Sequence, residues 1–176
     1  MKSIKLAVIG VLLLPALVFA HGPSRQKVTE SIEIDAAPDK VWAILQDFCS
    51  IKDWHPAINS CQSDQLDVGA IREIELANGE KVAEKLFKRD EEKMRMQYAM
   101  QLEKGRIIDG LPIATHGSTM TVKDNGGKTT VEWKGAFYRS FPGQQPPPEL
   151  SDAACIEAVT RLYSEGLQGL KAMAEK

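Results

Sequence analysis

His116 and Glu30 are the residues whose types and positions could support acid–base chemistry inside an apolar core. In a strand, His116 shares its alternation with Met120, and Glu30 shares that of Val28 and Ile32, so both side chains would face inward. A buried acid–base pair of this kind is what a cyclase or hydratase needs to move a proton. The other interpretation is a core histidine with satisfied hydrogen bonds and a glutamate at a frayed strand start.

The strong catalytic signatures are absent from the sequence. It contains no glycine-rich phosphate-binding loop, no Cys-x-x-Cys pair, no His-Glu-x-x-His and no Gly-x-Ser-x-Gly. Catalysis is therefore not the default prediction, and no cofactor is expected.

A set of inward-facing residues suggests either a ligand cavity or a filled core. Methionine or tyrosine alternates along the predicted strand 94–102, and two later strands repeat this logic. Together with His116, the predicted cavity residues are Met96, Tyr98, Met100, Met120, Trp133 and Phe137. Flexible methionines and aromatic rings suit an adaptable pocket for an apolar molecule. Taken singly, each is more often ordinary core packing, and only the set suggests a pocket.

The segment Trp54-His55-Pro56 has two interpretations. It could act as a lid or plug at the mouth of a cavity. Trp and His are also suited to interfaces, so Trp54 and His55 are predicted partner-contact residues, together with the loop 141–148.

The first twenty residues have the pattern of a secretory signal peptide. Lys2 and Lys5 precede an apolar run that ends at Ala20, with Pro15 inside it. The run is shorter than the about 20 residues that span a bilayer, so cleavage after Ala20 is predicted rather than an uncleaved membrane anchor. The expected mature protein is an exported single domain, residues 21–176, with no membrane span.

Cleavage would make His21 the N-terminal residue, whose amine and imidazole together could chelate copper. Such a site needs a third ligand, and His55 or His116 would have to supply it from elsewhere in the fold. We therefore expect no metal site.

Export to an oxidising compartment makes the cysteines informative. Cys49, Cys61 and Cys155 can form at most one intramolecular bridge. Cys49 and Cys61 are the favoured pair because they flank a short segment. Three buried, unpaired thiols remain an equal alternative.

Composition indicates an ordinary globular protein. With 43% hydrophobic and 26% charged residues in a chain of 176, a single packed domain is expected. The formal charge of −2 comes with no basic run, so nucleic-acid binding is not predicted.

Hydrophobic periodicity predicts one strand, two short helices, six strands and a long helix. Alternation predicts the first strand at 28–34, Pro38 suits the first turn of a helix, and 51–58 is a second helical or turn segment. A proline-rich loop at 141–148 precedes a helix from 156 to 173.

Between these helical segments, residues 61–140 indicate an antiparallel meander. Asn78-Gly79 and Asn125-Gly126 are each flanked by strand-like runs, and this predicts type I′ hairpins at both positions. This order of elements predicts an α+β helix-grip fold, in which a curved antiparallel sheet wraps around a long C-terminal helix.

The run SIEIDAAPDKVW from Ser31 to Trp42 resembles the opening motif of the SRPBCC superfamily, which includes START-type lipid carriers and polyketide cyclases. More narrowly, HGPSRQKV from His21 to Val28 and DWHPA from Asp53 to Ala57 resemble MxaD-type periplasmic proteins. This resemblance implies a non-catalytic accessory protein of a methanol dehydrogenase system. It would assist dehydrogenase maturation or contact with the acceptor c-type cytochrome.

Two alternatives come from other functional classes. A carrier of an apolar small molecule would need a continuous cavity. A cyclase-like or dehydrase-like enzyme would need Glu30, Tyr98 and His116 to converge inside it.

Overall fold

The computed structural model describes residues 22–103 and 105–176. The predicted signal peptide and His21 lie outside the described residues, so cleavage after Ala20 stays a prediction.

Seven antiparallel strands form one sheet in the order β1-β7-β6-β5-β4-β3-β2. The strands are β1 (Gln26–Ile34), β2 (Ile58–Ser63), β3 (Ile71–Leu76), β4 (Lys81–Asp90), β5 (Arg95–Gln101), β6 (Ile113–Asn125) and β7 (Lys128–Arg139). From β2 to β7, each strand pairs with the next strand in the sequence. The first strand, β1, pairs with β7, in a register that runs from Gln26–Phe137 to Ile34–Thr129. The predicted meander is confirmed.

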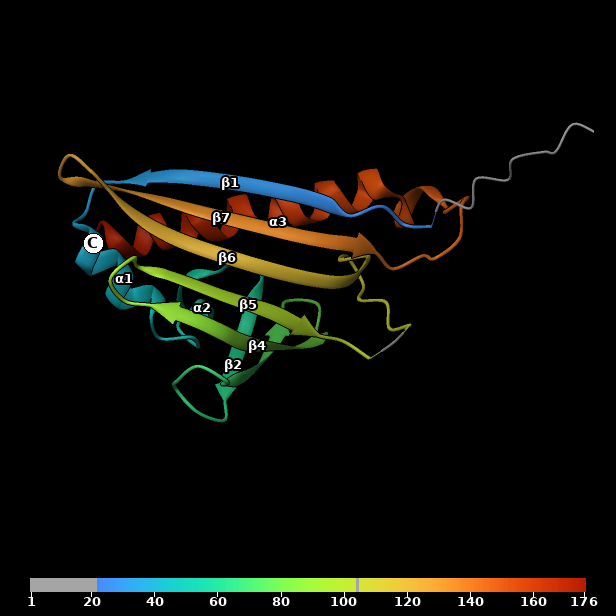
Figure 1. The fold of residues 1–176 in the computed structure, drawn as a ribbon, viewed down its shortest axis with the longest axis horizontal. Coiled ribbons are helices and arrows are strands. Elements are labelled where there is room, and N and C mark those ends of the chain that lie inside the picture. The colour runs from blue at the N-terminus through green and yellow to red at the C-terminus, as the bar shows by residue number, and fades with distance from the viewer. Residues whose placement is uncertain (1–21, 104) are drawn as a thin grey trace, which may run out of the picture.

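Helices flank this sheet. They are α1 (Pro38–Leu45), α2 (Ile51–Trp54), the 3-10 turn η1 (Pro148–Leu150) and α3 (Asp152–Ala174). Figure 1 shows the long helix α3 running along the sheet, and its residues contact mainly β1. The Ser151 hydroxyl caps α3 by accepting a hydrogen bond from the Ala154 amide at 3.2 Å. The helix-grip class and the element order are confirmed.

The two glycine turns differ in detail from the prediction. Asn125 pairs with Lys128, so the two-residue loop of this hairpin is Gly126-Gly127, one residue later than predicted. Both glycines have positive φ, 66° and 93°, which a type I′ turn requires. The other loop is longer than two residues and places only Gly79 at positive φ, so it is not a type I′ turn.

A disulfide joins Cys49, in the turn before α2, to Cys61 in β2. It anchors the helical segment to the edge strand, and the favoured pairing is confirmed. Cys155 is buried, and its thiol donates to the Pro112 carbonyl at 3.0 Å.

Within residues 22–103 and 105–176, no helix is long and apolar enough to cross a membrane. The same residues contain no group of three or more potential metal ligands.

Candidate functional site

A small, nearly enclosed cavity lies between the inner face of the sheet and helices α2 and α3. Its free volume is about 20 Å³, which is room for about one water molecule. The polar residues in its lining are His55, Arg72, Glu84, Tyr98, His116 and Trp133.

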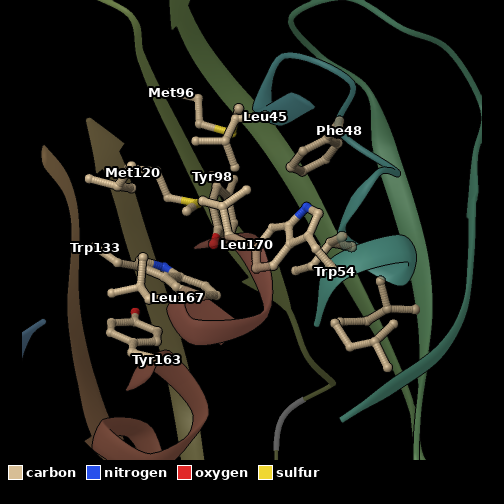
Figure 2. Packing of buried hydrophobic residues seen from close by; sticks show 14 of the residues in the cluster. Leu45, Phe48, Trp54, Met96, Tyr98, Met120, Trp133, Tyr163, Leu167 and Leu170 are labelled. Carbon is tan, nitrogen blue, oxygen red and sulfur yellow. The ribbon is translucent and has the colours of Figure 1, made fainter. Parts of the chain in front are cut away.

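Four of the predicted cavity residues line this space, namely Tyr98, Met100, His116 and Trp133. The other three, Met96, Met120 and Phe137, are buried in the surrounding core and do not line it. Figure 2 shows the core around the cavity, where the aromatic rings of Trp133 and Tyr163 pack together with Leu167 and Leu170 of α3. The inward orientation is as predicted, but packing leaves much less space than a pocket for a drug-sized ligand needs.

His116 belongs to a buried polar triangle. Its Nε2 lies 2.6 Å from the Tyr163 hydroxyl and 3.2 Å from Ser118 Oγ, and the two hydroxyls are 2.7 Å apart. Trp133 completes the cluster, because its Nε1–H points at Ser118 Oγ and its ring stacks on Tyr163 at 4.3 Å. The network connects β6, β7 and α3 across the core.

Two polar atoms on residues that line the cavity make no hydrogen bond of ordinary geometry within the described part of the chain, although the Tyr98 hydroxyl lies beside Ser118 and Trp133. They are Tyr98 Oη and His116 Nδ1, on side chains only 3% and 4% exposed. Burial raises the pKa of Tyr98 and lowers the pKa of His116. Both groups are therefore neutral at pH 7.

Arg72 and Glu84 form a buried ion pair at one wall of the cavity, with side chains 4% and 5% exposed. Arg72 Nε and Nη2 donate to Glu84 Oε2 at 2.8 and 2.5 Å, and Nη1 donates to the Phe48 carbonyl oxygen. The guanidinium lies 4.0 Å from the Phe48 ring centroid and 4.9 Å from that of Tyr98, a cation–π arrangement.

Our sequence reasoning missed this pair, although a signal was present. Arg72 shares the alternation of Ile74 in β3, and Glu84 shares that of Val82 in β4. Opposite charges at inward positions of two hairpin strands indicate a cross-strand pair, and the register places Arg72 opposite Glu84. Tyr163 and Ser118 were also missed; a tyrosine on the apolar face of a helix needs a buried partner for its hydroxyl.

The proposed pairing of Glu30 with His116 is wrong. Glu30 is half-buried in β1 opposite Trp133, and no hydrogen bond or ion pair joins it to His116 within the described part of the chain. The carboxylate beside the cavity is that of Glu84. Tyr98 and His116 do both reach the cavity.

The profile of one protein family matches residues 25–175, nearly all of the described chain. The chain belongs to the polyketide cyclase/dehydrase and lipid transport family. None of the curated proteins matches it.

Solved structures similar to this polyketide cyclase/dehydrase family member include the protein XoxI from Bacillus cereus. XoxI is 26% identical, with a TM-score of 0.68, and the match covers 84% of this chain and 94% of XoxI. An uncharacterised protein from Bacillus thuringiensis is 27% identical, with a TM-score of 0.69 and coverage of 86% and 100%. The ZhuI aromatase/cyclase from Streptomyces sp. R1128 shares the fold at 14% identity, with a TM-score of 0.67 and coverage of 86% and 94%.

In this family member the Trp54-His55 segment is buried, with exposed fractions of 6% and 2%. The Ala57 amide donates to His55 Nδ1 at 3.1 Å, so Nε2 carries the proton and donates to the Leu162 carbonyl at 3.0 Å. This geometry fits a plug. Partner contact by Trp54 or His55 stays a prediction that would require the segment to move.

We expect acid to destabilise this family member through His55. Burial lowers its pKa from 6.5 to about 4. Between these values the unfolded chain binds more protons at His55, so the contribution of this residue to the free energy of unfolding is fully present above pH 6.5 and is lost as the pH falls toward 4. The shift corresponds to about 3 kcal/mol.

Urea unfolding of the wild type and of His55→Gln at pH 7 and pH 4.5 checks this. The variant should lose much less stability between the two pH values than the wild type. Equal losses would show that protonation of His55 is not responsible.

Proposed function

We propose that this protein binds a small apolar molecule at the cavity between the sheet and α3, which widens on binding, and acts as a carrier without catalysis of its own. The observation that carries the proposal is the buried His116 Nδ1, which has no hydrogen-bond partner among the described residues, on a side chain that lines the cavity beside the Tyr98 hydroxyl. Unpaired buried polar groups are costly, so they commonly indicate a water or ligand partner. The family description, which includes lipid transport, supports a ligand-binding role.

Binding is favoured over cyclase-like catalysis by the state of the acidic and basic groups. Glu84, the carboxylate at the cavity, is engaged by two nitrogens of Arg72. His116 Nε2 is engaged by Tyr163 and Ser118. A general base must take a proton from the substrate, but the Glu84 carboxylate is ion-paired with Arg72 and burial lowers the pKa of His116, which makes its free Nδ1 a weak base.

The test is thermal unfolding of the mature protein, residues 21–176, with saturating benzene. Because a ligand that binds only the native state stabilises it, we expect a rise in Tm of about 3 °C. Met100→Trp, which adds bulk to the cavity lining, should abolish the rise, whereas Met173→Trp on α3 lies outside the lining and should keep it. A Tm that benzene leaves unchanged in every form would contradict the proposal.

The second candidate is a periplasmic accessory role in methanol oxidation, after cleavage of the signal peptide. What supports it is the resemblance of 21–28 and 53–57 to MxaD-type proteins. The partners would be a quinoprotein dehydrogenase and a c-type cytochrome. Pull-down from periplasmic extract should recover one of them with the mature protein; a retained small molecule with neither protein would favour the carrier.

A further inference from the structure

The enclosed cavity has a neighbour on the surface of the protein. A surface pocket of about 180 Å³ lies between α3 and the segments 76–78 and 109–111, and Asp109, Arg161 and Glu165 are the charged residues of its lining. Leu76, Leu111 and Leu162 line both the surface pocket and the enclosed cavity. We call these three residues the leucine wall, because their side chains are what the two spaces share.

The three residues of the leucine wall come from three different elements of the fold. Leu111 follows Gly110, whose φ is 74°, in a turn held by the hydrogen bond from the Leu111 amide to the Ile108 carbonyl at 3.1 Å. Leu76 ends strand β3, and Leu162 is a half-buried residue of α3. Rotamer changes of such side chains take picoseconds to nanoseconds when they are exposed, and longer when they are packed. The wall can therefore open without unfolding a strand or helix.

The sizes of the surface pocket and the inner cavity fit a ligand with one ring. An apolar cavity of about 150 Å³ is large enough to bind benzene. The surface pocket, at about 180 Å³, is large enough for one ring, and the inner cavity, at about 20 Å³, accepts a group the size of one hydroxyl.

The inner end of this space selects for a neutral hydroxyl group. Within the described residues, His116 Nδ1 has no hydrogen-bond partner and Tyr98 Oη makes no hydrogen bond of ordinary geometry, and burial keeps both groups neutral at pH 7. The Arg72–Glu84 pair in the same lining adds no net charge. A hydroxyl both donates and accepts, so it can satisfy His116 Nδ1 in either tautomer. A charged group would lose its hydration without a counter-ion.

We propose that the ligand is a neutral monocyclic alcohol or phenol that enters through the leucine wall and places its hydroxyl against Tyr98 and His116. This inference rests on the proposed carrier function and names its ligand class and route.

Ligand class is tested by calorimetric titration of the mature protein with p-cresol, toluene and p-toluate at pH 7. The expected result is binding of p-cresol at least about ten-fold tighter than toluene, which is the effect of one satisfied hydrogen bond, and weakest binding of p-toluate. Tyr98→Phe removes a hydroxyl that makes no hydrogen bond of ordinary geometry, so the variant should fold, keep toluene binding and reduce the preference for p-cresol. Equal affinities for p-cresol and toluene would overturn the ligand class.

The route is tested by stopped-flow association of p-cresol, followed by tryptophan fluorescence. Leu162→Ala should raise the association and dissociation rates at least about five-fold, and Leu162→Phe should lower both. Ile156→Ala, at a surface position of the same helix, is the control and should leave the rates unchanged. Unchanged rates in both Leu162 variants would overturn the route. Failure of every probe to bind would instead contradict the carrier function itself.

Discussion

Arg72→Met is expected to lower the free energy of unfolding by about 3–5 kcal/mol, because it leaves the Glu84 carboxylate buried without its partner. The side chains are 4% and 5% exposed, so bulk water does not reach the carboxylate to replace the lost donors. The Phe48 carbonyl also loses its hydrogen bond from Arg72. Methionine keeps an apolar stem between the Phe48 and Tyr98 rings, which separates the loss of charge from the loss of packing.

The double variant Arg72→Met/Glu84→Met should recover most of this loss, since a buried ion pair replaced by apolar groups is often neutral in stability. Lys81→Met is the matched control. It removes an ion pair of the same two strands, Lys81–Glu73 at 3.1 Å, whose side chains are 60% and 57% exposed. That change should cost less than about 1 kcal/mol. Urea unfolding measures all three, and a double variant no more stable than Arg72→Met would contradict the assignment of the cost to the unpaired carboxylate.

Gly169→Ala is expected to destabilise the protein by about 2 kcal/mol or more through overpacking, although alanine is the better helix former. A Cβ at position 169 of α3 would overlap the carbonyl oxygen of Trp54 at the end of α2. This oxygen belongs to the backbone, so the clash can be relieved only by moving α2 or α3. A displaced α2 would move His55 with it and so break the hydrogen bond from His55 to the Leu162 carbonyl.

Gln168→Ala is the control for this prediction, because residue 168 is exposed on the same turn of α3. It should change stability by less than about 0.5 kcal/mol. Thermal and urea unfolding compare the variants. A Gly169→Ala protein as stable as the wild type would mean that α2 does not pack against α3 as closely as described.

Local patterns were enough to predict the elements. The alternation of Val28 to Ile34 and the three-and-four spacing in α3 arise because each element turns one face to the core. Their order led to the correct fold class, and proximity in sequence favoured the correct Cys49–Cys61 pair. The loop of the last hairpin was misplaced by one residue because consecutive glycines allow either position.

The sequence by itself determined which side chains point inward, including Tyr98, His116 and Trp133, because inward orientation follows from local periodicity. Only the tertiary structure decided which of them meet. His116 and Tyr163 are 47 residues apart, and their contact depends on how α3 lies on the sheet. Glu30 failed as the partner of His116 for the same reason. The cavity volume was also undetermined, because it is the small remainder after dense packing of many side chains, which no local pattern records.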